Sequence, residues 1–145
     1  MRTPMRPSPE PASSAIVERD GRFLLVRRRN PPAADLYAFP GGRGEAGETP
    51  AETALRELHE ETGLQGSNPR LYAVYDLKSG GVEDGPPSHF MLSVFLVDAD
   101  PVSPAMAASD AKEVGWFSLD EIHMLPAPPS VLECAERLAR ERQSR

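Results

Sequence analysis

The sequence is poor in three features, and each shortage excludes a class of protein. It contains a single cysteine, Cys134, so no disulfide can form within the chain, and a reducing cytoplasm is the expected compartment. It contains no run of about 18 apolar residues, so no membrane-spanning helix and no membrane partner are expected. It contains 16 basic against 22 acidic side chains, and the net charge of -6 argues against nucleic acid as a partner.

The 145 residues are enough for one domain with a hydrophobic core. Residues 1–12 hold four prolines and no apolar stretch, which predicts a flexible N-terminal arm rather than a secretory signal. Residues 13–145 contain no internal repeat and no sign of a second domain, so they predict a single domain.

Apolar runs bounded by turn residues predict several strands. Residues 13–29 predict a β-hairpin that turns at Asp20 and Gly21. Polar loops are expected at 79–88 and 99–111. The further strands are expected at 36–39, 70–78, 89–98 and 112–119.

The helix expected after Thr49 has the clearest boundaries. Thr49 is a good N-cap, Pro50 suits the first helical position, and Glu52 completes a capping box. Gly63 is placed to end the helix as a left-handed glycine. A helical turn at 120–125 and a C-terminal helix at 130–143 are also expected. With the strands, these segments predict an α+β or α/β domain with a mixed sheet and one main helix on each side.

Three glutamates, Glu57, Glu60 and Glu61, fall on one turn of this helix. Side chains three and four residues apart share a face, so the carboxylates repel one another unless a cation compensates them. Taken alone, the pattern is typical of a solvated acidic face. Gly41 and Gly42 allow the backbone to come close to the same place, and Mg²⁺ binds carboxylates together with phosphate oxygens. A metal site is therefore the second interpretation.

Residues 42–64 resemble the Nudix box, G-x5-E-x7-R-E-U-x-E-E-x-G-U with U apolar, at each of its nine specified positions. These positions are Gly42, Glu48, Arg56, Glu57, Leu58, Glu60, Glu61, Gly63 and Leu64. The flanking stretches "YAFPGG" and "EVGWFSLDEI" are similar to those of the family as well. The chain is identified by this complete motif as a member of the Nudix hydrolase family.

The resemblance implies an α/β/α sandwich with a mixed central sheet, in which the box forms a loop, a helix and a loop. It also implies hydrolysis of the pyrophosphate bond of a nucleoside diphosphate derivative, with Mg²⁺ or Mn²⁺ as cofactor. Glu48 and Arg56 would form an ion pair that supports the loop against the helix. The implied metal ligands are the Gly41 carbonyl and the catalytic carboxylates of Glu57, Glu60 and Glu61.

The general base that activates the attacking water stays open between two glutamates. Some family members appear to use a glutamate in the box, and others use one from a later loop. Glu57 is the first candidate. Glu113, just before "VGW", is the candidate from outside the box and is alternatively a further metal ligand.

Three residues before the box are candidates for substrate binding. Arg27 and Arg28 end the second strand of the hairpin, where related proteins often place an arginine that contacts phosphate. The alternative is a solvated pair of arginines. Tyr37 lies where family members often carry an aromatic residue near the substrate, and a position in the core is the alternative.

The substrate is the least constrained expectation. Ser79 stands where a proline often marks ADP-ribose hydrolases, and residues 80–82 lack the tyrosine that often marks dinucleoside polyphosphate hydrolases. The stretch before the box resembles short bacterial proteins labelled ADP-ribose pyrophosphatase, so a substrate like ADP-ribose is preferred. The alternatives are a (d)NTP pyrophosphohydrolase that cleans the nucleotide pool and a nucleotide sensor without catalysis. Dimers are common among similar proteins, which makes a homodimer a candidate assembly.

Overall fold

Eight strands and three helices are present among residues 9–30, 34–81 and 85–144, the residues that this computed structural model describes. The strands are β1 (Glu10–Ile16), β2 (Glu18–Arg19), β3 (Arg22–Arg28), β4 (Tyr37–Ala38), β5 (Gly41–Arg43), β6 (Gly66–Gly81), β7 (Gly85–Ala99) and β8 (Ala111–Phe117). The helices are α1 (Pro50–Thr62), α2 (Leu119–His123) and α3 (Pro129–Gln143). None of these described helices is both long and apolar enough to cross a bilayer.

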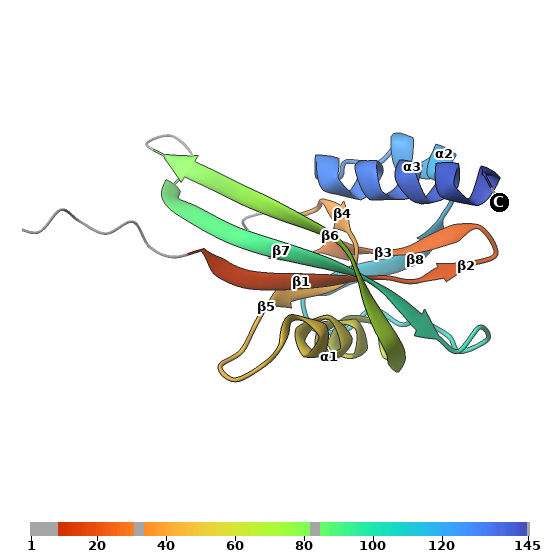
Figure 1. Cartoon of the computed structure of the whole chain (residues 1–145), viewed down its shortest axis with the longest axis horizontal. Coiled ribbons are helices and arrows are strands. Elements are labelled where there is room, and N and C mark those ends of the chain that lie inside the picture. Colours follow the sequence, from red (N-terminus) through yellow and green to blue (C-terminus); the bar gives the residue numbers. More distant parts are fainter. Residues whose placement is uncertain (1–8, 31–33, 82–84, 145) are drawn as a thin grey trace, which may run out of the picture.

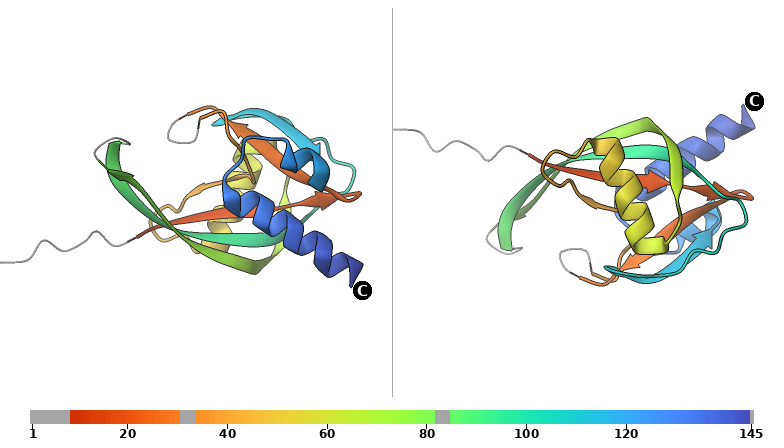
Figure 2. Two further views of the ribbon diagram at one scale, coloured as in Figure 1. Left: turned by 90° about the horizontal axis from the view of Figure 1, so that it is seen from above. Right: turned by 90° about the horizontal axis from the view of Figure 1, so that it is seen from below.

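The strands form two sheets that are enclosed by the helices. In the first sheet the order is β5-β1-β7-β6, with β1 and β7 parallel and the other pairs antiparallel, so the sheet is mixed. In the second sheet β3 pairs antiparallel with β2, β4 and β8. Helix α1 lies below the sheets and α2 and α3 lie above them (Figure 1), and Figure 2 shows the same layers from above and below. This is the α/β/α arrangement expected from the sequence.

A hydrophobic core lies on each face of the sheet layer, because apolar side chains follow one another along the inner strands. On β1, Ala15 packs with Leu58 of α1, whereas its neighbour Ile16 packs with Val131 and Leu138 of α3. All four of these side chains are buried. The two helices are therefore held on opposite faces by successive residues of the same strand.

Helix α1 begins and ends where the sequence predicts. The Thr49 hydroxyl accepts the Glu52 N–H at 3.2 Å, and the Glu52 carboxylate accepts the Thr49 N–H at 2.9 Å, which completes the capping box. Gly63 follows the helix with a φ of 79°, and its N–H donates to the His59 carbonyl at 2.8 Å. Both ends of the segment that carries the three glutamates are thus capped.

The predicted hairpin at residues 13–29 forms only near its turn. Asp20 and Gly21 adopt left-handed φ values of 52° and 76°, and β2 pairs with the start of β3. Strand β1 instead joins the other sheet, where it pairs with β5 and β7. The hairpin prediction is wrong for β1, because turn residues specify pairing near the turn and not with distant partners.

Three element boundaries also differ from those predicted. Residues 79–81 and 85–88 continue β6 and β7 where a polar loop was expected, and residues 82–84 lie outside the described residues. Strand β1 begins at Glu10, so residues 10–12 of the expected arm belong to a strand, and residues 1–8 lie outside the described residues. Gly42 and Arg43, which begin the loop expected at the start of the box, belong to strand β5, because its backbone pairs with β1.

Candidate active site

The glycine pair, Gly41 and Gly42, lies directly against two carboxylates of α1. Pairing with β1 fixes β5 beside this helix. The Gly41 N–H donates to Glu61 Oε2 at 2.8 Å. A Cβ added to Gly42 would lie 2.6 Å from Cδ of Glu57, which is too close for two carbon atoms. Only glycine therefore permits this approach of the backbone to the Glu57 carboxylate.

Arg56 contacts three members of the acidic cluster, which consists of Glu48, Glu57, Glu60 and Glu61. Its Nε and Nη2 donate to the two oxygens of Glu48 at 2.7 and 3.1 Å, the bidentate geometry of a strong ion pair. Its Nη1 donates to Glu57 at 2.8 Å and to Glu60 at 3.1 Å. Glu48 also accepts hydrogen bonds from the Thr53 hydroxyl and the Glu45 N–H, and together with the contact from Arg56, the largest cause, they hold the pKa of Glu48 at about 2. The supporting pair that the sequence predicts is present, and Arg56 also bridges two of the predicted metal ligands.

Glu61 is the buried member of the cluster, with 2% of its surface exposed. Among the described residues it forms no ion pair, and it accepts the hydrogen bond from Gly41. Burial raises the pKa of Glu61 to about 8; the charges of Glu57 and Asp110 act in the same direction, while the Gly41 N–H and the charge of Arg28 oppose it. Burial also raises the pKa of Glu57. An ionised Glu61 is therefore costly unless a cation compensates it.

This burial predicts a pH dependence of the metal-free protein. The pKa of Glu61 is about 8 in the folded chain against a usual value of 4.5, so the folded state binds the extra proton between these values. Stability should therefore fall as the pH rises from 4.5 to 8. Glu61→Gln removes this titration, and its thermal midpoint should exceed that of the wild type at pH 8 but approach it at pH 5. Glu133→Gln, on the exposed side of α3, is the control. If the thermal midpoint changes equally with pH in the wild type and in Glu61→Gln, the prediction is contradicted.

The chemistry of this cluster fits a hard divalent cation, although the side chains do not enclose one as they stand. Among the described residues, no three His, Cys, Asp or Glu side chains are arranged to hold a metal ion. The reason is that Glu57 and Glu60 face Arg56 Nη1. The available donors are all oxygens, which suits Mg²⁺ or Mn²⁺. Rotation of these two side chains would free them, while Arg56 would stay in place through Glu48.

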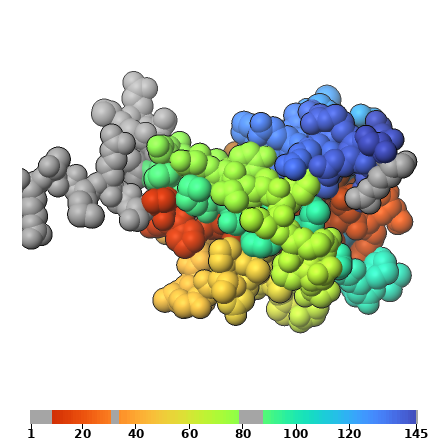
Figure 3. Space-filling view, in the orientation of Figure 1, coloured from red at the N-terminus to blue at the C-terminus, as the bar shows by residue number. Residues whose placement is uncertain are grey.

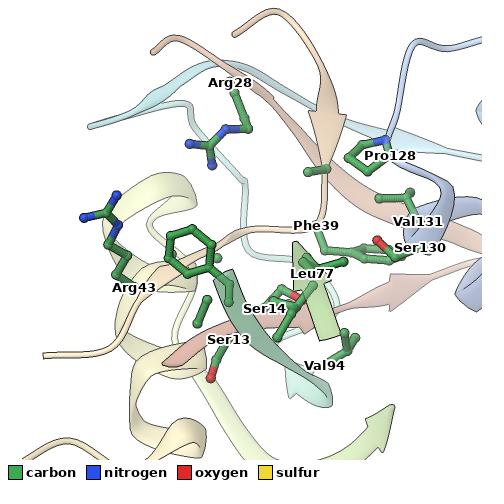
Figure 4. Close-up of a pocket in the computed structure, with 16 residues that line it drawn as sticks. Ser13, Ser14, Arg28, Phe39, Arg43, Leu77, Val94, Pro128, Ser130 and Val131 are labelled. Atoms are coloured by element: carbon green, nitrogen blue, oxygen red, sulfur yellow. The ribbon is translucent and has the colours of Figure 1, made fainter. Parts of the chain in front are cut away.

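A cavity of about 350 Å³ lies next to the acidic cluster, because its lining includes the glycine pair, which contacts Glu57 and Glu61. Figure 4 shows the guanidinium groups of Arg28 and Arg43 on one side of it and Phe39, Pro128 and Val131 on the other. The cavity thus has a cationic side and an apolar side. This arrangement suits a ligand that carries both an anionic group and an apolar or aromatic one.

Of the three predicted substrate-binding residues, only Arg28 is among the described residues that line this cavity. Arg27 and Tyr37 instead contact Glu113 across the second sheet. The Tyr37 hydroxyl donates to Glu113 Oε2 at 3.2 Å, and Arg27 Nη1 lies 3.5 Å from Glu113 Oε1. Burial and the contact with Glu113 raise the pKa of Tyr37. The roles assigned to these three residues stay predictions.

Two parts of the site were not anticipated from the sequence. Leu77 of β6 and Phe90 of β7 line the cavity, but alternating apolar residues predict only that a strand has a buried face. Asp110 pairs with Arg28, at 3.3 Å between Oδ2 and Nη2, and its charge acts on the carboxyl of Glu61. The signal that could have revealed Asp110 is an acid at the end of a long loop, directly before the last strand.

Comparison with known proteins gives this arrangement a family. Residues 8–140 match the NUDIX domain family. An ADP-ribose pyrophosphatase from Methanocaldococcus jannaschii is 36% identical over 117 residues, which are 81% of this chain and 66% of that protein. The MutT NUDIX hydrolase from Burkholderia pseudomallei has a TM-score of 0.76 at 26% identity, over 90% of this chain and 98% of that one. A bifunctional NMN adenylyltransferase/ADP ribose pyrophosphatase from Francisella tularensis, complexed with AMP and a manganese ion, has a TM-score of 0.76 at 30% identity, over 96% of this chain and 43% of that one.

The family match spans most of the chain, so this protein belongs to the Nudix family. The family predicted from the box and the α/β fold class are both confirmed. The chain spans 66% of the length of the relative from Methanocaldococcus jannaschii and less than half of the bifunctional protein.

Proposed function

We propose that this protein is a hydrolase that cleaves the pyrophosphate bond of a nucleoside diphosphate derivative, with ADP-ribose or a similar compound as its preferred substrate. The observation that carries the proposal is the contact of the glycine pair, which lines the cavity, with Glu57 and Glu61. One end of the cavity can thus hold the diphosphate beside the carboxylates. The names of two of the compared proteins, both ADP-ribose pyrophosphatases, support the choice of substrate.

Mg²⁺ or Mn²⁺ is the proposed cofactor, with the Gly41 carbonyl and the carboxylates of Glu57, Glu60 and Glu61 as ligands. The all-oxygen donor set and the manganese ion in the Francisella tularensis structure support this assignment. When bound, the ion neutralises phosphate charge and lowers the pKa of a water that it holds. Glu57 and Glu60 would turn from Arg56 to hold the ion, and Glu48 would keep Arg56 in place.

The reaction needs one bond cleavage and one proton transfer. A water attacks one phosphorus atom, the bond from that phosphorus to the bridging oxygen breaks, and the oxygen leaves with the other phosphoryl group. Glu57 is the first candidate to take the proton of the water, because burial raises its pKa towards the working range of a general base. Glu113 is the second candidate, although its carboxylate would first have to leave Tyr37.

The cavity suggests how the substrate would lie. Arg28 would bind a phosphate group through its guanidinium, which suits phosphate oxygens. The base or the second sugar would lie among the apolar side chains, where Phe39 offers an aromatic ring. Arg27 and Tyr37 would contact only a substrate that extends beyond the cavity.

Two other functions remain as alternatives at the same site. A (d)NTP pyrophosphohydrolase would release a nucleoside monophosphate and pyrophosphate, whereas hydrolysis of ADP-ribose releases AMP and ribose 5-phosphate. A sensor would bind a nucleotide and release nothing. The intact set of box glutamates favours an enzyme over a sensor.

A substrate panel tests the proposal. The purified chain is incubated with ADP-ribose, NADH, nucleoside triphosphates including oxidised ones, diadenosine polyphosphates and nucleotide sugars, with Mg²⁺ or with chelator, and products are separated by chromatography. ADP-ribose is expected to be cleaved fastest, and only with Mg²⁺. Pyrophosphate release from a triphosphate as the dominant reaction would favour the pool-cleaning enzyme, and no product from any compound would contradict the proposed activity.

Three further features complete the proposal. A cytoplasmic location agrees with the single cysteine, which is buried and free. A homodimer could form along β6, the edge strand of the first sheet, which lies at the surface in Figure 3. Its apolar side chains Leu71 and Val74 are 60% and 50% exposed. The acidic net charge agrees with a small nucleotide rather than a nucleic acid as the substrate.

A further inference from the structure

Within the part of the chain that the structure describes, one acidic residue, Asp110, pairs with Arg28 at the cavity. Arg28 is the last residue of β3, and its side chain is 26% exposed. Its Nη2 lies 3.3 Å from Asp110 Oδ2, and its Nε is buried without a hydrogen-bond partner among the described residues. A guanidinium has five N–H donors, so the contact with Asp110 leaves most of them available to a ligand.

Asp110 is itself fixed from the other side by Asn30. Its Oδ1 accepts the Asn30 side-chain amide at 2.6 Å and the Asn30 backbone N–H at 3.2 Å. Its backbone carbonyl also accepts the Arg29 N–H at 2.8 Å. One carboxylate therefore joins the arginine of the cavity to the chain that follows β3.

The loop before Asp110 is bonded to the helix that carries the acidic cluster. The Ala108 N–H donates to the Glu61 carbonyl at 3.0 Å, and the Met106 N–H donates to the Thr62 carbonyl at 2.9 Å. Asp110 thus stands between the end of α1 and the end of β3. Movement of its carboxylate would change the position of Arg28 relative to the Glu61 end of the cluster.

We propose that Asp110 is a positioning residue, which holds the Arg28 guanidinium where its remaining donors meet a phosphate group of the substrate. This inference rests on the proposed function, because it assigns to Arg28 the phosphate of the substrate that is cleaved. It adds a residue outside the box, from the loop before β8, to those on which substrate affinity depends.

Asp110→Asn is the informative substitution. Asn30 donates to Oδ1 and Arg28 lies at Oδ2, and an amide places an NH₂ donor at one of these two positions, so one of the two contacts is lost. The loss of one charge-assisted contact should raise KM about tenfold. The value of kcat should change by less than about threefold, because Asp110 would act through ground-state binding of the substrate.

The chain supplies a matched control. Asp98 makes the same two kinds of contact, with Arg70 at 3.2 Å and with the Asn68 amide at 3.1 Å, on the edge of the first sheet. None of these three residues lines the cavity among the described residues. Asp98→Asn should leave KM and kcat unchanged, which separates the position of Asp110 from the general loss of an Arg–Asp–Asn contact.

The experiment is a double-mutant cycle on ADP-ribose hydrolysis, with wild type, Asp110→Asn, Arg28→Ala and the double variant. If Asp110 acts through Arg28, Asp110→Asn should raise KM about tenfold in the wild-type background but by less than about twofold in the Arg28→Ala background.

Isothermal titration with AMP in the presence of chelator measures binding without turnover. Both single variants should bind AMP more weakly than the wild type. Asn30→Ala, which removes the shorter contact to Asp110, should raise KM in the same direction and serves if Asp110→Asn does not fold.

The outcomes separate the two proposals. An active wild type with an unchanged KM in Asp110→Asn and Asn30→Ala, or with additive effects in the cycle, would overturn the positioning role and leave the proposed function standing. A wild type that cleaves nothing in the panel would overturn the proposed function and this role with it. A fall in kcat at constant KM would also contradict the assignment, because it would place Asp110 in the chemical step.

Discussion

Replacing Glu57 by glutamine should lower kcat by about 10³-fold or more while the fold remains intact. Glutamine has nearly the same shape as glutamate, and its amide oxygen can still accept the hydrogen bond from Arg56 Nη1, which Glu57 accepts at 2.8 Å. The substitution removes the charge that would hold the metal ion and the site that would accept the proton. Both losses fall on the transition state, so kcat should fall rather than KM rise.

The measurement is steady-state hydrolysis of ADP-ribose with Mg²⁺, together with a thermal melt. Glu133→Gln makes the same chemical change on an exposed part of α3 and should retain wild-type turnover. If a folded Glu57→Gln variant keeps near-normal turnover, the box is not the site of catalysis.

Gly42→Ala should lower kcat by about 10²-fold with little loss of stability, because a displacement of about 1 Å at a catalytic group can have that effect. The new methyl group would lie 2.6 Å from Glu57 Cδ and 2.7 Å from its Oε1. These atoms are the far end of a flexible side chain, so the carboxylate can turn away. The fold is thereby spared, and the catalytic geometry is lost.

Two neighbouring glycines test this explanation. A methyl group on Gly44 would lie 3.3 Å from Thr53 Oγ1, a tight contact that a small shift of this hydroxyl relieves, so Gly44→Ala should retain activity. A methyl group on Gly41 would lie 2.5 Å from the Ser13 carbonyl of β1, so Gly41→Ala should lose stability as well as activity. Equal activity in Gly42→Ala and Gly44→Ala would contradict the close approach of β5 to Glu57.

Local signals in the sequence predict the helix and its acidic face well. The capping box of Thr49 and Glu52 and the left-handed Gly63 depend only on residues a few positions apart, and all are present in the structure. Glu48 and Arg56 are likewise only eight residues apart, with Glu48 directly before the N-cap of α1. Such features need no knowledge of the distant chain.

The parts that were missed depend on contacts between distant segments. Strand β1 leaves the expected hairpin to pair with Phe90 to Leu96 of β7, and no turn signal near β1 specifies that partner. The cavity brings residues of β1, β3, β4, β5, β6, β7 and α3 together, so no single segment indicates it. Asp110 is recognisable only when the end of β3 and the loop before β8 lie side by side.

Binding of Mn²⁺ tests most directly the claim that the box glutamates form a metal site. Manganese electron paramagnetic resonance can count ions bound to the wild type, to Glu57→Gln, to Glu61→Gln and to Glu133→Gln, without any substrate. The account predicts specific binding to the wild type and to Glu133→Gln, and much weaker binding to Glu57→Gln and Glu61→Gln. Equal binding by all four proteins, or none by a folded wild type, would contradict it.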